Sequence, residues 1–191
     1  MKLDFQFGQK DDAITIPYPA FFNEKRNNNG FFNLRTKPEL IDEIKECNSS
    51  LALKKMLIRF AVSQLPIFTV GCDLGNHIEA SCKENESNIA GGYIQFTSLP
   101  DENIDHTNWW ALFKNVENTF LDLIGNDNWI LNIILSPLCF KLAKSDEIVD
   151  TVNVNFWAKA SSLENAIDSR ERLILELDKS LSADTIYKFF H

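Results

Sequence analysis

The chain has 191 residues, of which 45% are hydrophobic and 24% charged, so it can bury the core of one folded domain and is too apolar to be disordered. Its 27 acidic side chains exceed its 19 basic ones and give a formal charge of −8, which disfavours binding to nucleic acid because no basic patch interrupts it. No apolar run approaches the ~20 residues of a membrane-spanning helix, and the first residues lack the apolar core of a secretory signal. We therefore expect a cytoplasmic protein without membrane contact, whose four cysteines stay reduced.

The first 35 residues are predicted to form β-hairpins. Residues 3–7 and 13–16 alternate apolar and polar side chains on either side of a polar turn. Two Phe-Phe pairs then flank Asn29-Gly30, a dipeptide that accepts the positive φ angles of a tight hairpin turn.

Residues 36–65 are predicted to be helical. Thr36 can cap a helix that has Pro38 in its first turn, and a polar run at residues 48–50 interrupts that helix. Apolar residues at helical spacing predict a second helix over residues 51–64, which ends before Pro66.

Residues 66–191 are predicted to form a sheet with two further helices. Gly75-Asn76 is expected to be the turn between the first two strands, while Thr107 and the capping box at residues 161–164 are expected to begin the helices. The expected strands are residues 67–74, 77–82, 91–99, 129–135 and 151–160.

The order of these elements predicts an α+β fold. The strands come in consecutive groups and do not alternate strictly with helices, which favours a largely antiparallel sheet with about four helices, mainly covering one face. No linker or internal repeat divides the sequence, so we expect a single domain over residues 1–191.

Residues 71–82 hold the densest group of reactive side chains. One hypothesis is a small cysteine-dependent enzyme, in which His77 activates Cys72 and Glu79 orients the imidazole. The alternative is two strands and a turn with a buried thiol, and it is favoured because residues 69–71 have the composition of a buried strand.

Metal and cofactor sites are not expected. A single histidine between two cysteines ten positions apart lacks the ligand spacing of a zinc site. Phosphate-binding glycine loops, dinucleotide fingerprints and hydrolase motifs are also missing from the sequence.

Adjacent tryptophans at the start of the helix after Thr107 suggest a binding surface. Trp110 falls on the predicted apolar stripe, which leaves Trp109 toward solvent beside His106. Trp157 is expected to point outward from its strand, and each outward Trp is interpreted either as a partner contact or as a ring lying flat on a loop.

The apolar C-terminal tail, residues 185–191, must also be covered. Phe189 and Phe190 either dock back on the domain or form a subunit interface of a homo-oligomer, and both alternatives stay open. Together these features favour a non-enzymatic protein-binding module, such as an acidic immunity or inhibitor protein or an accessory subunit, whose partner has a basic surface.

Overall fold

The computed structural model describes residues 3–7, 14–22, 27–79, 87–99, 102, 104–123, 128–140 and 147–190 of the chain. The statements on structure that follow refer to these residues.

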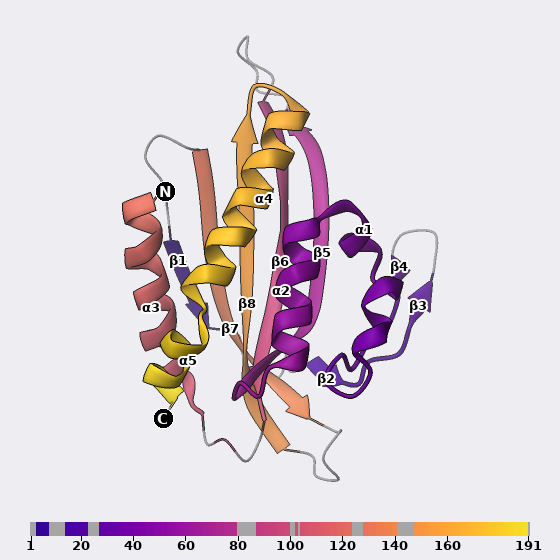
Figure 1. The fold of residues 1–191 in the computed structure, drawn as a ribbon, viewed down its shortest axis with the longest axis vertical. Coiled ribbons are helices and arrows are strands. Elements are labelled where there is room, and N and C mark those ends of the chain that lie inside the picture. The colour runs from indigo at the N-terminus through magenta and orange to yellow at the C-terminus, as the bar shows by residue number, and fades with distance from the viewer. Residues whose placement is uncertain are drawn as a thin grey trace.

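Four long strands form an antiparallel sheet at the centre of the molecule (Figure 1). The sheet order is β1-β7-β8-β6-β5, and β2 also pairs with β7. Six helical segments accompany the sheet, which confirms the predicted α+β class. The strands of the sheet are β1 (Leu3–Phe7), β2 (Ile14–Ile16), β5 (Ile67–Glu79), β6 (Ser87–Ser98), β7 (Asn128–Phe140) and β8 (Glu147–Ala160).

One face of the sheet carries the main hydrophobic core. Along β8 the buried side chains alternate with polar ones, so that every second residue from Val152 to Ala158 faces the helices. Three helices cover this face: α2 (Leu51–Val62), α3 (His106–Leu123) and α4 (Leu163–Ser180). The prediction that the helices mainly cover one face is confirmed.

Short helices complete the chain on either side of this layer. The 3-10 helix η2 (Pro38–Glu43) and the single turn α1 (Lys45–Ser49) precede α2 and lie beyond the β5 edge of the sheet (Figure 1). The last helix, α5 (Ala183–Phe190), contacts α3 and is one helix more than the sequence predicted for residues 66–191.

Serine caps begin α2 and α4. Ser50 Oγ accepts a hydrogen bond from the Leu53 N–H at the start of α2, and Ser162 Oγ accepts one from the Asn165 N–H at the start of α4. The second cap lies within the predicted capping box. Thr36 does not cap the 3-10 helix, because Lys37 is the residue at that position and makes no side-chain cap bond. Helix α3 begins at His106 and not at the predicted Thr107, and Asp105 Oδ1 accepts hydrogen bonds from the N–H groups of Thr107 and Asn108.

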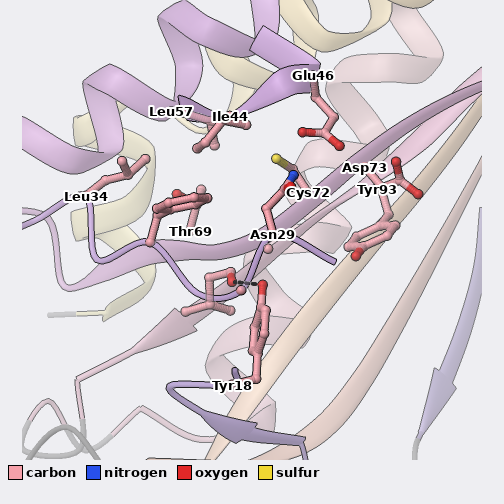
Figure 2. A pocket seen from close by; sticks show the side chains of 14 residues that line it. Tyr18, Asn29, Leu34, Ile44, Glu46, Leu57, Thr69, Cys72, Asp73 and Tyr93 are labelled. Carbon is pink, nitrogen blue, oxygen red and sulfur yellow. Dashed lines mark hydrogen bonds between the residues drawn. The ribbon is translucent and has the colours of Figure 1, made fainter. Parts of the chain in front are cut away.

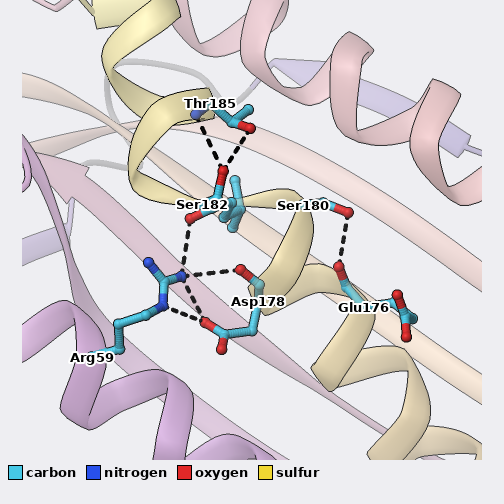
Figure 3. A network of polar contacts seen from close by, with 7 residues as sticks. Arg59, Glu176, Asp178, Ser180, Ser182 and Thr185 are labelled. Atoms are coloured by element: carbon cyan, nitrogen blue, oxygen red, sulfur yellow. Dashed lines mark hydrogen bonds and ion pairs between the residues drawn. The ribbon is translucent and has the colours of Figure 1, made fainter.

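Helices α2 and α4 are tied together by a polar network around Arg59 (Figure 3). The guanidinium donates from Nε to Asp178 Oδ1 at 2.7 Å and from a terminal nitrogen to the carbonyl oxygens of Asp178 and Leu181, at 3.2 and 3.0 Å. It also stacks over the Phe60 ring, 4.3 Å from the ring centroid. The planar fork thereby satisfies the carbonyl groups at the C-terminal end of α4.

The predicted N-terminal hairpins are partly wrong. Strands β1 and β2 do not pair with each other, because both lie parallel to β7, with Leu3 opposite Leu131 and Ile14 opposite Leu138. Alternation indicates that a segment is a strand but does not specify its partner. A short hairpin does form between β3 (Phe21–Phe22) and β4 (Asn27–Asn28), with its connection at residues 23–26 outside the described part of the chain.

Asn29-Gly30 follows that hairpin and is not its turn. Gly30 nevertheless has a φ of +85°, as expected for a glycine in a sharp change of direction. A side chain there would lie 2.9 Å from the backbone nitrogen of Ala20, so both the angle and the close approach require glycine.

The predicted turn at Gly75-Asn76 is also wrong. Strand β5 is continuous from Ile67 to Glu79, and Gly75 and Asn76 lie opposite Gly91 and Ala90 of β6. The long ladder with β6 overrides the local turn preference of the two residues. The connection between β5 and β6 comprises residues 80–86, which the structure does not describe, and residues 80–82 of the predicted second strand are among them.

A β-bulge interrupts β5 between Thr69 and Gly71. Phe68, which precedes the bulge, and Val70, which is its extra residue, pack with Ile16 in a second, small apolar cluster. After the bulge, Cys72 and Leu74 pack against the main core. The extra residue thus changes which side chains of the strand face the helices.

None of the helices that the structure describes combines the length and the apolar character needed to cross a membrane.

Candidate functional site

A cavity of about 640 Å³ opens beside β5, where the sheet ends. We call it the edge cavity. Strand β5 forms one wall, and the segment from Asn29 to Leu34 together with Glu46 of α1 and Leu57 in the middle of α2 forms the other (Figure 2). Its lining residues are Tyr18, Asn29, Gly30, Phe32, Leu34, Ile44, Glu46, Leu57, Thr69, Val70, Gly71, Cys72, Asp73 and Tyr93.

The edge cavity has a polar side and an apolar side. In Figure 2 the Glu46 carboxylate, the Cys72 thiol, Asp73 and Tyr93 gather toward one side of the view. Apolar side chains from three separate elements occupy the other side, namely Leu34, Ile44 and Leu57. Ligand sites commonly combine an apolar surface with a few convergent polar groups, and their volumes are typically about 300–1,000 Å³.

Tyr18 closes one part of the cavity wall. Its hydroxyl donates a hydrogen bond to the Val70 carbonyl oxygen at 3.2 Å, drawn in Figure 2, and its ring meets Phe31 edge to face. Burial is the main cause that raises the pKa of Tyr18 to about 12, and the nearby Tyr93, Cys72 and Glu46 contribute in the same direction. The phenol therefore stays a proton donor throughout the physiological range.

The pKa values of the Cys72 thiol and the Tyr93 phenol are shifted in the same direction. Burial raises the pKa of the Cys72 thiol, and the charges of Glu46, Cys47 and Asp73 raise it further. The pKa of Tyr93 is also raised, first by burial and then by Asp73. No arginine, lysine or histidine is among the lining residues that the structure describes, so the potential in the cavity is negative.

The structure does not bring Cys72, His77 and Glu79 together as a nucleophile, base and orienting acid. Cys72 and His77 lie five positions apart on one continuous strand, which separates their Cα atoms by roughly 16 Å and places the two positions on opposite faces. A nucleophile and its base need hydrogen-bond contact. The raised pKa of Cys72 further disfavours the thiolate that this chemistry requires.

The structure shows Trp109 and Trp110 in the opposite orientations to those predicted. Trp109 is 0% exposed, whereas Trp110 is 39% exposed. Trp109 stacks on Phe113 with ring centroids 6.3 Å apart and meets Phe190 edge to face at 5.2 Å. Trp109 is thus a core residue in this structure and not a partner contact.

The sequence did contain a signal for the correct orientation. Trp109, Leu112, Phe113 and Val116 are all buried and follow the spacing i, i+3, i+4, i+7 of an apolar helix face. The predicted stripe already contained Phe113 and Val116, and its error was to include Trp110 in place of Trp109 at its start.

Two other residues expected to contact a partner are covered by the chain itself. Phe190 is only 7% exposed, and Phe189 packs against the main core. The Asn108 side chain donates to the Phe189 carbonyl oxygen at 2.9 Å and ties α5 to the start of α3. In this structure Phe190 thus follows the first alternative for the tail, which is docking back on the domain. His106, at the first residue of α3, is exposed as predicted.

Trp157 lies half-buried on the sheet face opposite the helices. It pairs with Gly91 of β6, and a side chain at Gly91 would lie 2.6 Å from Trp157 Cδ1. Gly91 therefore provides the space in which the indole lies against the sheet. The ring thus lies against strand β6, whereas the predicted alternative was a ring lying flat on a loop.

Sequence reasoning missed the edge cavity entirely. Its lining residues come from separate segments between Tyr18 and Tyr93, and none of these segments contains a recognisable motif.

Among the side chains that the structure describes, no three histidine, cysteine, aspartate or glutamate residues are grouped as they would be around a metal ion. A search of protein-family models, curated proteins and solved structures gave no match to the chain. The interpretation of the site therefore rests on its own residues.

Proposed function

We propose that the protein is a non-enzymatic protein-binding module that pairs an extended segment of its partner with the outer edge of β5. An acidic immunity or inhibitor protein, or an accessory subunit of a larger assembly, would act in this way. The observation that carries this function is the free edge of β5 directly beside the edge cavity.

Strand β5 is the last strand of the sheet order, and no strand in the described ranges pairs with its outer edge. The Asp73 carbonyl oxygen lies against Gly92 of β6 and so points into the sheet. Since backbone groups alternate in direction along a strand, the N–H and C=O groups of Leu74 and Asn76 point outward. These groups are available to hydrogen-bond an added strand.

The beginning of the same edge is already occupied by side chains. Arg35 donates to the carbonyl oxygens of Leu65 and Ile67, and Tyr18 donates to that of Val70. Protection of this kind is common at sheet edges, because an unprotected edge promotes association with other chains. The edge that follows Val70 has no such side-chain donors among the hydrogen bonds described, which favours it as the place where a partner strand adds.

Strand addition divides affinity and specificity between backbone and side chains. Main-chain hydrogen bonds supply the affinity, and pockets along the edge select alternate side chains of the added segment. The edge cavity is placed to act as such a pocket, since Gly71, Cys72 and Asp73 of β5 line it. The net charge of −8 would accelerate the encounter with a basic partner.

Proline at position 76 tests this function, because it removes an outward N–H without removing a hydrogen bond of the β5–β6 ladder. Asn76→Ala is the matched control, as it changes the same side chain and keeps the N–H. Tagged wild type and both variants are used to capture partners from the native host, with equal amounts of folded protein verified by circular dichroism and melting temperature.

We expect wild type to capture a specific partner protein. The amount captured by Asn76→Ala should stay within about twofold of wild type. The amount captured by Asn76→Pro should fall at least tenfold, because this variant loses one hydrogen bond to the partner and adds a local steric conflict. Equal capture of every specific partner by wild type and by a folded Asn76→Pro variant would contradict strand addition at β5.

A further inference from the structure

We propose that the edge cavity is a binding site for an organic cation, an alkylammonium or guanidinium group carried on an apolar stem. The source of this cation is a lysine or arginine side chain of the partner, and this part of the proposal rests on the proposed function. The cation site itself can be tested without the partner.

Charge complementarity is the first reason. Glu46 and Asp73 contribute two carboxylates to the lining, and the described lining contains no basic side chain that could neutralise them. Lys54 of α2 is paired with Asp42, at 2.6 Å. A cationic ligand would supply the missing positive charge, whereas a phosphate or carboxylate ligand would be repelled.

The effect of these charges extends to the neighbouring acids. Glu46 raises the pKa of Tyr18, Cys72 and Tyr93, and Asp73 raises that of Cys72 and Tyr93, in each case in addition to burial. All three groups thus respond to negative charge in the same cavity. A bound cation would reverse that contribution.

The aromatic and apolar walls indicate what kind of cation fits. The rings of Tyr18, Phe32 and Tyr93 line the cavity, and ring faces attract ammonium and guanidinium groups at short range. Leu34, Ile44 and Leu57 offer a surface for a hydrocarbon stem. A bare metal ion would find too few oxygen ligands, since the described residues contain no group of three ligating side chains.

The geometry also argues against a reaction at this site. The Cys72 thiol of the lining has a raised pKa, which disfavours the thiolate that nucleophilic attack requires, and no described lining residue is a histidine or lysine. In this proposal the cavity holds its ligand without changing it.

Titration with n-butylammonium and n-butylguanidinium tests the site, with n-butanol as the neutral control. Binding is followed by the amide resonances of Gly71, Cys72 and Asp73 in nitrogen-15 spectra of the full chain. For ligands this small we expect a Kd on the order of 1 mM, and shifts concentrated at these β5 residues. Butanol that binds as tightly at the same residues would overturn the cation site.

Two variants remove one carboxylate each, Glu46→Gln and Asp73→Asn. Each is expected to weaken ammonium binding about fivefold, as for the loss of one partly exposed ion pair. Glu43→Gln is the matched control, because Glu43 is an exposed carboxylate of η2 outside the lining. Equal weakening by Glu43→Gln would show that only the overall charge matters and would overturn the proposal.

The source of the cation is tested with a capped pentapeptide, Val-Thr-Lys-Thr-Val, and its analogue with norleucine in place of lysine. We expect the lysine peptide to bind at least fivefold more tightly and to lose binding in Asn76→Pro, while butylammonium binds that variant unchanged. If butylammonium binds but the two peptides bind equally, a free amine is the ligand and the side-chain source is wrong. If Asn76→Pro abolishes partner capture while butylammonium does not bind, the proposed function stands and the cation site falls.

Discussion

Replacing Trp109 by Ala should destabilise the protein far more than replacing its neighbour Trp110. Trp109 is 0% exposed and is held between Phe113 and Phe190, whereas Trp110 is 39% exposed and has Lys114 over its ring at 5.1 Å. The two variants remove the same chemical group from adjacent positions of α3, so their difference isolates burial.

The size of the effect follows from the area that the indole removes from water. A buried aromatic side chain covers about 150–250 Å², which at ~25 cal/mol per Å² corresponds to roughly 4–6 kcal/mol. The indole Nε1 of Trp109 is buried without a described hydrogen-bond partner, so its removal returns about 1 kcal/mol. We expect Trp109→Ala to lower the free energy of unfolding by about 3–5 kcal/mol, within the usual range for such a change.

Trp110→Ala should cost less than about 1 kcal/mol, the usual value of an exposed cation–π contact. Urea unfolding followed by circular dichroism at 222 nm measures both values, and for a chain of this length each kcal/mol corresponds to roughly 2–4 °C in Tm. If Trp110→Ala proved as destabilising as Trp109→Ala, the orientation of α3 and the docking of α5 on it would be refuted.

Three further predictions concern other parts of the molecule. Gly91→Ala should lower the free energy of unfolding by about 2 kcal/mol or more, because the added methyl would lie 2.5 Å from a carbonyl oxygen of β8. Gly75→Ala is the control: a methyl group there has no atom within 4 Å and should have little effect on Tm. Arg59→Lys keeps the charge but loses the planar fork toward Asp178 and should cost about 1 kcal/mol in urea unfolding; no change would show that the network in Figure 3 is not stabilising. At pH 8, Cys72 should react with a thiol reagent at least tenfold more slowly in the native chain than in the urea-unfolded chain, because the fold raises the pKa of its thiol. Peptide mapping measures the modification of Cys72, and fast modification in the native chain would contradict this prediction.

The sequence was informative wherever local periodicity decides the structure. Alternation located β8, and the serine at residue 162 correctly indicated the start of α4. Consecutive strand patterns were sufficient for the α+β class, because a chain with that order of elements has few other ways to cover its sheet. Each of these features depends on residues that lie close together in the chain.

Features that depend on distant contacts were not predictable. The pairing of β1 with β7 and the continuity of β5 through Gly75-Asn76 are both set by a neighbouring strand, which a local pattern does not specify. The edge cavity combines residues as far apart as Tyr18 and Tyr93, and its charge pattern exists only once the fold has formed. The error at Trp109 differs in kind, since the correct spacing was present in the sequence and the wrong one of two adjacent tryptophans was assigned to the apolar face.

The parallel pairing of Leu3 with Leu131 has a consequence for synthesis of the protein. The first strand leaves the ribosome early, but the strand that hydrogen-bonds it is made only after most of the chain, a delay of roughly 6–26 s at ordinary translation rates. During this interval an apolar N-terminal segment stays exposed to chaperones and to other nascent chains. Fusions that bury or immobilise the N-terminus should therefore reduce the yield of folded protein more than the same fusions placed after α5.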